Sequence, residues 1–113
     1  MAHLSLETSL VGRVAVIALG GELDLAGATL FEDAVARVDE AAPAALVVDL
    51  RGLEFMDSSG LRVIAVAAQR AHDHGRRFAL VPGKAQVMRV FEITRMGERL
   101  TFVDDAAEVN EPS

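Results

Sequence analysis

Apolar and polar residues follow two different periods along this chain, and the changes between them mark the expected elements. Residues 13–19, 46–50 and 77–81 are short, nearly continuous apolar runs, which is typical of strands buried on both faces. Residues 4–7 alternate between apolar and polar, which predicts a short edge strand, followed by a hairpin turn over residues 8–12. A last short strand is expected at residues 101–103.

Helical spacing appears between these strands. Asp24 is placed to cap a first helix, whose apolar face ends before Ala41-Ala42-Pro43 because Pro43 disfavours helix at Ala42. A second helix opens at residues 57–60 and ends near Gly75, and a third is expected over residues 86–93. The expected inward faces of the first two helices are Leu30, Phe31, Ala34, Val35 and Val38, and then Leu61, Ile64, Ala65, Ala68 and Ala71.

Three stretches predict breaks or turns. Gly20-Gly21 is a natural end for the strand over residues 13–19. Residues 51–54 read as a turn, after which Phe55-Met56 returns to the core. The last residues, 110–113, are expected to fray.

Strands that alternate with helices indicate an α/β domain with a mixed sheet. We expect four to five strands packed against three to four α-helices, with an antiparallel opening pair and right-handed parallel crossovers later. The 113 residues suit a single domain, over residues 1–109, with residues 110–113 as a tail. Hydrophobic residues make up 51% of the chain and aromatic residues only 4%, so Val, Leu, Ile and Ala must build the core.

The formal net charge is −6, and Arg76-Arg77 is the only adjacent basic pair. Nucleic acid is therefore excluded as a main partner, because phosphate binding needs a basic field. There is no cysteine, no apolar run long enough to cross a membrane, and no signal-peptide pattern at the N-terminus. We expect a cytoplasmic protein without a membrane partner or a cofactor, as a monomer or weak dimer.

The candidate site is Asp57-Ser58-Ser59-Gly60, at the start of the second helix. One interpretation is a plain N-cap, since Asp and Ser are both preferred caps. The other is a regulated serine at a helix N-terminus, where unpaired N–H groups and the helix dipole would accept an anion. Phosphorylation there adds about two negative charges, enough to change a partner surface.

The stretch Phe55-Met56-Asp57-Ser58-Ser59-Gly60-Leu61 resembles the signature of the STAS family, the sulphate-transporter and anti-sigma-factor-antagonist domains, and in particular the bacterial anti-anti-sigma factors of sporulation and stress response. Gly20 to Asp24 is similar to the family's Gly-Glu-Leu-Asp turn. Residues 47–50 and 90–94 are similar to the strand before the serine and to a late helix. The resemblance spans residues 6–103.

The resemblance implies partner switching. The unphosphorylated antagonist binds an anti-sigma factor, which is also a serine kinase, and so releases a sigma factor; phosphorylation ends this binding until a serine phosphatase reverses it. It makes Ser58 the phospho-acceptor, with Ser59 as an alternative, and places Asp24, Asp57 and Gly60 at the same surface. Arg62 departs from the common Gly and puts a charge one turn from the serine. Other family members are constitutive scaffolds or accessory subunits of membrane-transport complexes, and that alternative stays open.

Val63 and Val66 lie off the expected core face of the second helix. They predict either an exposed docking patch beside Ser58 or a helix more buried than its periodicity implies. A hydrolase is disfavoured, because His72 lies several turns from Ser58 and the motif is not a Gly-x-Ser-x-Gly elbow. His72 and His74 alone make a poor metal site.

Overall fold

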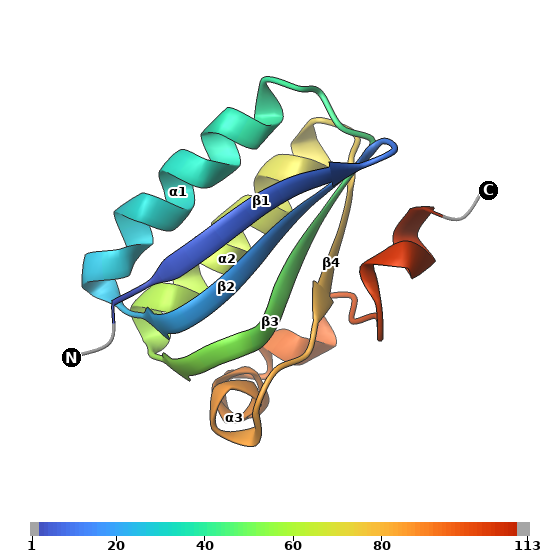
Figure 1. The fold of residues 1–113 in the computed structure, drawn as a ribbon. Helices are drawn as coiled ribbons and strands as arrows, with labels where there is room; N and C mark the ends of the chain where they lie inside the picture. Colours follow the sequence, from blue (N-terminus) through green and yellow to red (C-terminus); the bar gives the residue numbers. More distant parts are fainter. Residues whose placement is uncertain (1–2, 111–113) are drawn as a thin grey trace.

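The computed structural model describes residues 3–110, in which one mixed four-stranded sheet is covered by helices (Figure 1). This confirms the predicted α/β class. The elements are β1 (Ser5–Val11), β2 (Val14–Leu23), α1 (Leu25–Asp39), β3 (Ala45–Met56), α2 (Ser58–Asp73), β4 (Arg77–Val81), α3 (Ala85–Thr94) and the 3-10 helices η1 (Met96–Glu98) and η2 (Ala106–Asn110).

The strands lie in the order β1-β2-β3-β4. β1 and β2 form an antiparallel hairpin, whereas β2 with β3 and β3 with β4 are parallel, as the alternating pattern predicts. The strand expected at residues 101–103 is a single parallel bridge between Phe102 and Leu80.

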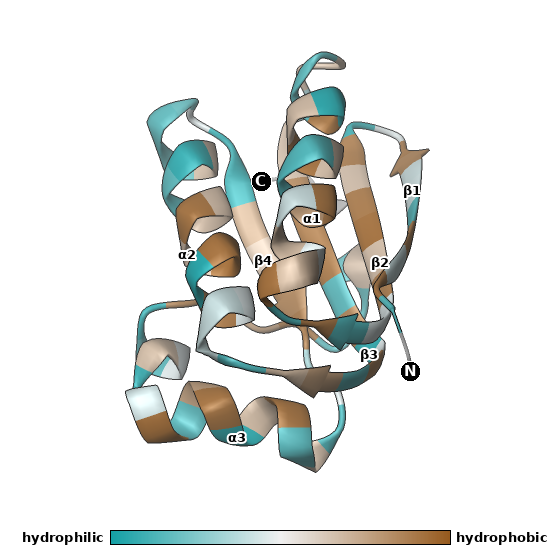
Figure 2. Ribbon diagram, turned by 90° about the vertical axis from the view of Figure 1, so that its left-hand side faces the viewer, coloured by the Kyte–Doolittle hydropathy of each residue, from teal (hydrophilic) through white to brown (hydrophobic). Residues whose placement is uncertain are grey.

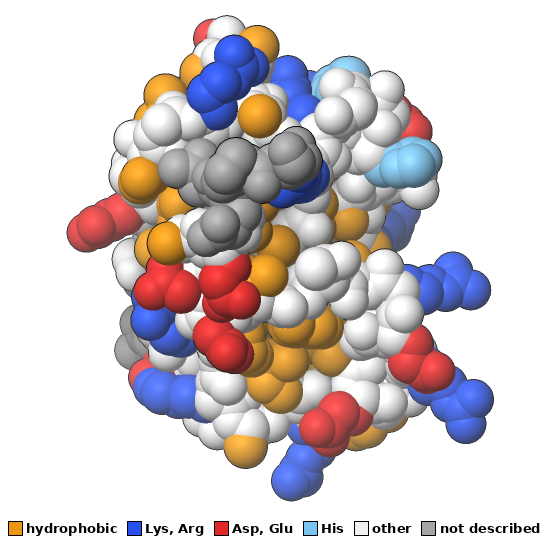
Figure 3. All heavy atoms as spheres, turned by 90° about the vertical axis from the view of Figure 1, so that its right-hand side faces the viewer, with side chains coloured by type: hydrophobic (Ala, Val, Ile, Leu, Met, Phe, Trp, Pro, Cys, Tyr) orange, Lys and Arg blue, Asp and Glu red, His pale blue; other side chains and the backbone are white. Residues whose placement is uncertain are grey.

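The helices α1 and α2 lie side by side over one face of the sheet, and α3 lies at its lower end (Figure 2). The main core fills the space between them and includes Ile17, Phe31, Ile64, Leu80 and Phe91. A smaller apolar cluster lies on the opposite face, under η2. Hydrophobic and acidic side chains stand next to one another on that side of the molecule (Figure 3). Both faces of the central strands are therefore buried, which explains their unbroken apolar runs.

Three predicted turns are wrong, because the strands run through them. β1 continues to Val11, and only Gly12 and Arg13 form the turn, with Gly12 at a φ of +62°. β2 does not end at Gly20-Gly21 but reaches Leu23, and β3 runs through residues 51–54 to Met56.

Glycines let these two strands continue together. Gly20 pairs with Gly52, and the register shifts on both sides of this region. A Cβ on Gly52 would lie 2.8 Å from the carbonyl oxygen of Leu19, closer than real Cβ atoms come. Glycine here therefore allows close backbone approach at a bulge rather than a chain reversal.

The expected ends of the helices are confirmed. α1 ends at Asp39, shortly before Pro43, and α2 is followed by Gly75 at a φ of +70°. Asn110 is the last residue of η2, and residues 111–113 lie outside the described residues, so the fraying expected of the tail stays a prediction.

Candidate functional site

Two helices begin next to each other at one end of the sheet. Leu23 and Met56 are the last paired residues of β2 and β3, and the chain enters α1 and α2 directly after them. Neighbouring strands lie about 4.8 Å apart, so Asp24 and Asp57 start their helices side by side. This end of the sheet collects most of the residues that the sequence singles out.

Asp57, not a serine, caps α2. Its Oδ1 accepts hydrogen bonds from the main-chain N–H groups of Ser59 (2.9 Å) and Gly60 (3.1 Å). Its own N–H donates to the carbonyl of Leu23 at 3.3 Å and ties the start of α2 to the end of β2. Asp24 caps α1 in the same way, accepting from Gly27 N–H at 2.9 Å. The capping role predicted for Asp24 is confirmed, and among the candidate caps Asp57, Ser58 and Ser59 it is Asp57 that caps α2.

Ser58 is consequently free of any capping role. It is the first residue of α2, it is exposed, and its hydroxyl makes no hydrogen bond within residues 3–110. A solvent-facing hydroxyl with no structural task is accessible to modification without loss of a native contact. Ser59, the second helical residue, is only half-exposed.

Gly60 is a packing residue. It is buried, and a Cβ there would lie 2.4 Å from the carbonyl oxygen of Leu23 and 2.7 Å from Cγ of Met56. Only glycine lets the first turn of α2 approach the end of β2 this closely. Gly60 therefore positions the first turn of α2, which carries Ser58, and is itself too buried to contact a partner.

Val63 and Val66, which the docking interpretation places in one exposed patch, differ in their exposure. Val66 is 53% exposed, as the docking interpretation requires, whereas Val63 is only 8% exposed, so its predicted exposure is wrong. Val63 faces α1 across a shallow groove of about 70 Å³, because α2 packs against a neighbouring helix as well as the sheet. Residues from both helices line the groove: Phe31, Glu32, Val35, Val63, Val66, Ala67 and Arg70.

Ser58, Arg62 and Val66 follow one another at intervals of four residues and are all exposed. At that spacing they form a single outward stripe along α2. Arg62 makes no ion pair within the described residues, so its charge faces solvent one turn from Ser58.

Two exposed apolar side chains at this end of the sheet were missed by the sequence reasoning. Leu25, directly after the Asp24 cap, is 75% exposed, and Phe55, two residues before Asp57, is 46% exposed. The expected return of Phe55-Met56 to the core is wrong for Phe55 and confirmed for Met56, which is buried together with Leu53.

Ser58 and His72 are too far apart to form the serine–histidine pair of a hydrolase. His72 lies fourteen residues along α2 from Ser58, or about 21 Å at the rise of a helix. Within residues 3–110, no three metal-ligating side chains gather, and no helix is both long and apolar enough to cross a bilayer.

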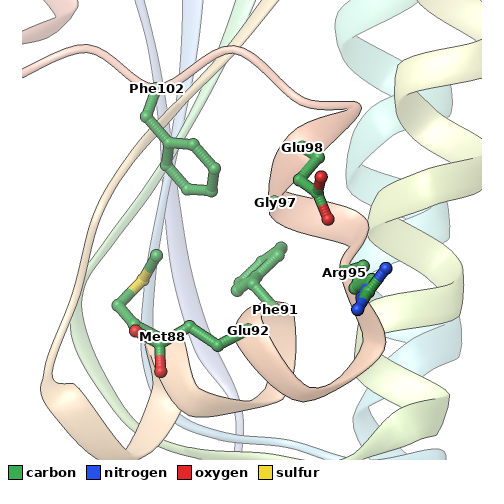
Figure 4. Close-up of a pocket in the computed structure, with 7 residues that line it drawn as sticks. All are labelled: Met88, Phe91, Glu92, Arg95, Gly97, Glu98 and Phe102. Atoms are coloured by element: carbon green, nitrogen blue, oxygen red, sulfur yellow. The ribbon is translucent and has the colours of Figure 1, made fainter.

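A further, mainly apolar pocket lies elsewhere, beside α3 (Figure 4). It holds about 270 Å³, and the rings of Phe91 and Phe102 meet edge to face in its wall, 5.6 Å apart. Its charged rim carries Glu92, Arg95 and Glu98, without a nucleophile beside a base. No residue of α2 lines it, so it is separate from the Ser58 end of the molecule.

Comparison with known proteins finds similarity to anti-sigma factor antagonists. Over 57 residues the chain is 42% identical to the anti-sigma-F factor antagonist RsfB of Mycobacterium tuberculosis; the match covers 50% of this chain and 47% of RsfB, about half the length of that relative. The crystal structure of an anti-sigma factor antagonist from Mycobacterium paratuberculosis superimposes with a TM-score of 0.85 at 26% identity, covering 96% of this chain and 95% of that one. The phosphorylated form of the Bacillus cell fate determinant SpoIIAA gives a TM-score of 0.72 at 20% identity over 94% and 97% of the two chains, and shares the fold.

The first two relatives carry the names of regulatory antagonists, not of enzymes. The family described as "Mlab, STAS domain" matches residues 6–104, nearly the whole chain. The resemblance of the serine motif is thereby confirmed: this chain belongs to the STAS family.

Proposed function

We propose that this protein is an anti-sigma factor antagonist, and that phosphorylation of Ser58 switches off its binding to the anti-sigma factor. The observation that carries the proposal is the free Ser58 hydroxyl, exposed at the start of α2 while Asp57 alone caps the helix. The names of the relatives in the STAS family support the class of partner.

The proposed docking surface surrounds this serine. It consists of Asp24, Leu25, Phe55, Ser58, Arg62 and Val66. Its three apolar members are between 46% and 75% exposed, and each protrudes close to a polar residue. Exposed apolar groups bordered by polar ones are characteristic of protein-binding sites. Leu25 and Phe55 are the expected anchors, since they are the largest exposed apolar side chains of this surface and would bury the most area against a partner.

A phosphate on Ser58 would act against this surface. It adds about two negative charges directly beside the carboxylate of Asp57. That carboxylate already accepts from the N–H groups of Ser59 and Gly60, so these two donors are not free to bind the phosphate. The dianion must therefore stay hydrated, and stripping its water against a partner costs several kcal/mol. Because about 1.4 kcal/mol is a factor of ten in affinity, one phosphate is sufficient to release the partner.

The resemblance to the STAS antagonists implies the enzymes that would act on the site. The anti-sigma factor would itself be the serine kinase of Ser58. A serine phosphatase would return the antagonist to its binding form. Ser59 is the alternative acceptor, but its half-exposed position makes it the poorer substrate.

The proposal is tested by measuring the intact mass of the protein from its native host, with peptide mapping. We expect a form heavier by one phosphate, with the phosphate on Ser58. The Ser58→Ala variant should retain the anti-sigma factor as bait and lose the phosphate, whereas Ser58→Asp should bind more weakly. Ser59→Ala is the matched control and should still be phosphorylated.

Two results would contradict the proposal. If Ser58→Ala is labelled by the kinase as fast as the unmodified protein, the acceptor is another residue. If no phosphate appears under any growth or stress condition, the protein acts as a constitutive scaffold or as an accessory subunit of a signalling or membrane-transport complex.

A further inference from the structure

We propose that two copies of this chain associate through the free edge of β1, forming a continuous eight-stranded sheet across a two-fold axis. β1 is the end strand of the sheet and pairs only with β2. Within residues 3–110, no other segment covers its outer edge, which runs along the side of the molecule (Figures 1 and 2). An uncovered edge strand presents unpaired N–H and C=O groups to a further strand.

The edge lacks the features that normally prevent such pairing. Proteins protect edge strands with lysines, prolines, bulges or short length. β1 is seven residues long, pairs with β2 without a register shift, and contains no Lys or Pro; Glu7 is its only charged residue. Leu10 and Val11, at its end, are 57% and 55% exposed.

The main-chain groups available for pairing follow from the hairpin. Val11 pairs with Val14 across the two-residue turn, so Val11 and every second residue before it direct their main-chain groups towards β2. Leu6, Thr8 and Leu10 alternate with these and direct theirs outward. These three residues must therefore be the ones that bond to any added strand.

A second copy of β1 fits this set of donors and acceptors. In an antiparallel pair centred on Thr8, Thr8 faces Thr8 of the second copy and Leu6 faces Leu10. All three outward residues then meet outward residues, and the apolar side chains lie opposite each other. Glu7 faces Ser9, so the like charges of the two copies are not directly opposed. A two-fold symmetric pair requires a strand that is complementary to itself, and β1 meets this requirement when the pair is centred on Thr8.

The flank of α1 beside β1 extends the same surface. Arg37 of α1 and Ala41, two residues beyond the end of that helix, form a groove with Thr8 and Leu10. Leu30 lies two turns before Arg37 on the same side of the helix and is 41% exposed. Pairing of two β1 strands would bring these flanks together, so Leu10 and Leu30 would be covered as the sheet is joined. Because the strands run antiparallel, the two Ser58 ends would lie at opposite ends of the dimer and remain open.

The register predicts a disulfide cross-link, and the chain contains no native cysteine to confuse it. In the Thr8→Cys variant the two thiols would face each other with Cα atoms about 5.5 Å apart, within the range of a disulfide. The matched control is Ser5→Cys on the same strand. Its two copies would lie six residues apart along the joined strands, about 20 Å, and cannot be bridged.

The test combines cross-linking under mild oxidation with light-scattering mass measurements over a concentration series. We expect the unmodified protein to approach twice 12.0 kDa at high concentration, and Thr8→Cys but not Ser5→Cys to form a covalent dimer. Leu10→Lys should weaken association at least tenfold. Ile93→Lys, at a more exposed apolar position on α3, should leave association unchanged.

Three outcomes would overturn the proposal. The first is a monomeric mass at every concentration without cross-linking of Thr8→Cys. The second is equal cross-linking of Ser5→Cys and Thr8→Cys, which indicates random collision. The third is a dimer that Leu10→Lys does not weaken, which places the contact elsewhere. None of these measurements depends on phosphorylation, so the proposal stands or falls separately from the role of Ser58.

Discussion

Replacing Gly60 by Ala is predicted to destabilise the protein, although alanine normally favours a helix. Gly60 is the third residue of α2, and the added Cβ would lie 2.4 Å from the carbonyl oxygen of Leu23. That oxygen belongs to the main chain of β2 and accepts the N–H of Asp57. It cannot move aside like a flexible side chain. The first turn of α2 must therefore shift outward.

Two opposing terms set the size of the effect. Alanine gains about 0.8–1.0 kcal/mol over glycine in a helix interior, and less in a first turn. Forcing an extra carbon into a packed site costs typically about 1–3 kcal/mol, and a clash with main chain belongs at the upper end of that range. The expected net loss in the free energy of unfolding is therefore about 2 kcal/mol. For a domain of this size, it lowers the melting temperature by roughly 8 °C.

The assay is urea and thermal unfolding followed by far-ultraviolet circular dichroism. Gly97→Ala is the matched control, because a Cβ there meets nothing closer than 3.7 Å, the Cβ of Phe91, and Gly97 does not have a positive φ. We expect Gly97→Ala to lie within about 0.5 kcal/mol of the unmodified protein. A Gly60→Ala protein as stable as the original would refute the close approach of α2 to β2, and with it the placement of Ser58.

Three further predictions concern the cap, the valines and one ion pair. Asp57→Ala should lower the free energy of unfolding by about 1 kcal/mol in urea titrations, whereas Asp57→Asn should lose only a few tenths; equal losses would argue against the cap. Val63→Ala should cost about 2 kcal/mol and Val66→Ala less than about 0.5 kcal/mol, so the reverse order would contradict the burial of Val63. Burial raises the pKa of Asp49, but the hydrogen bonds and charge of Arg51 outweigh it and hold that pKa below its usual value. The stability this supplies is present above the unfolded-state pKa and is lost as the pH falls through the folded-state pKa. Arg51→Gln should therefore raise the pKa of Asp49 in an NMR titration and destabilise most near neutral pH, with the difference vanishing in acid; a difference that persists in acid would have another cause.

The sequence predicts the start of α2 well because the signals there are local. An aspartate before a helix caps it through N–H groups two and three residues away, so the contact depends on little else. The end of α2 at Gly75 is predictable for the same reason, since a left-handed residue follows the last turn. Which residue of Asp57-Ser58-Ser59 serves as the cap was not predictable, since all three types are suitable.

The sequence cannot predict features set by distant neighbours. Periodicity assigned α2 one buried face, towards the sheet, but Val63 is buried by α1, which packs beside it. Phe55 resembles a core residue in any local window. Its exposure depends on the register of β3 against β2, which pairs it with Glu22.

The least predictable stretch determines the geometry of the proposed docking surface. Had β2 ended at Gly20 and β3 at Leu50, as the turn signals suggest, α1 and α2 would begin at the ends of flexible connections. Instead both strands continue past the Gly20–Gly52 pair, and their last paired residues are Leu23 and Met56. A loop could hold Asp24 and Asp57 in many relative positions, but paired strands hold them in one. The glycines that look like chain breaks therefore allow two capped helices to form one surface. A substitution at Gly52 should change the relative positions of Asp24 and Asp57, although Gly52 does not belong to the proposed docking surface.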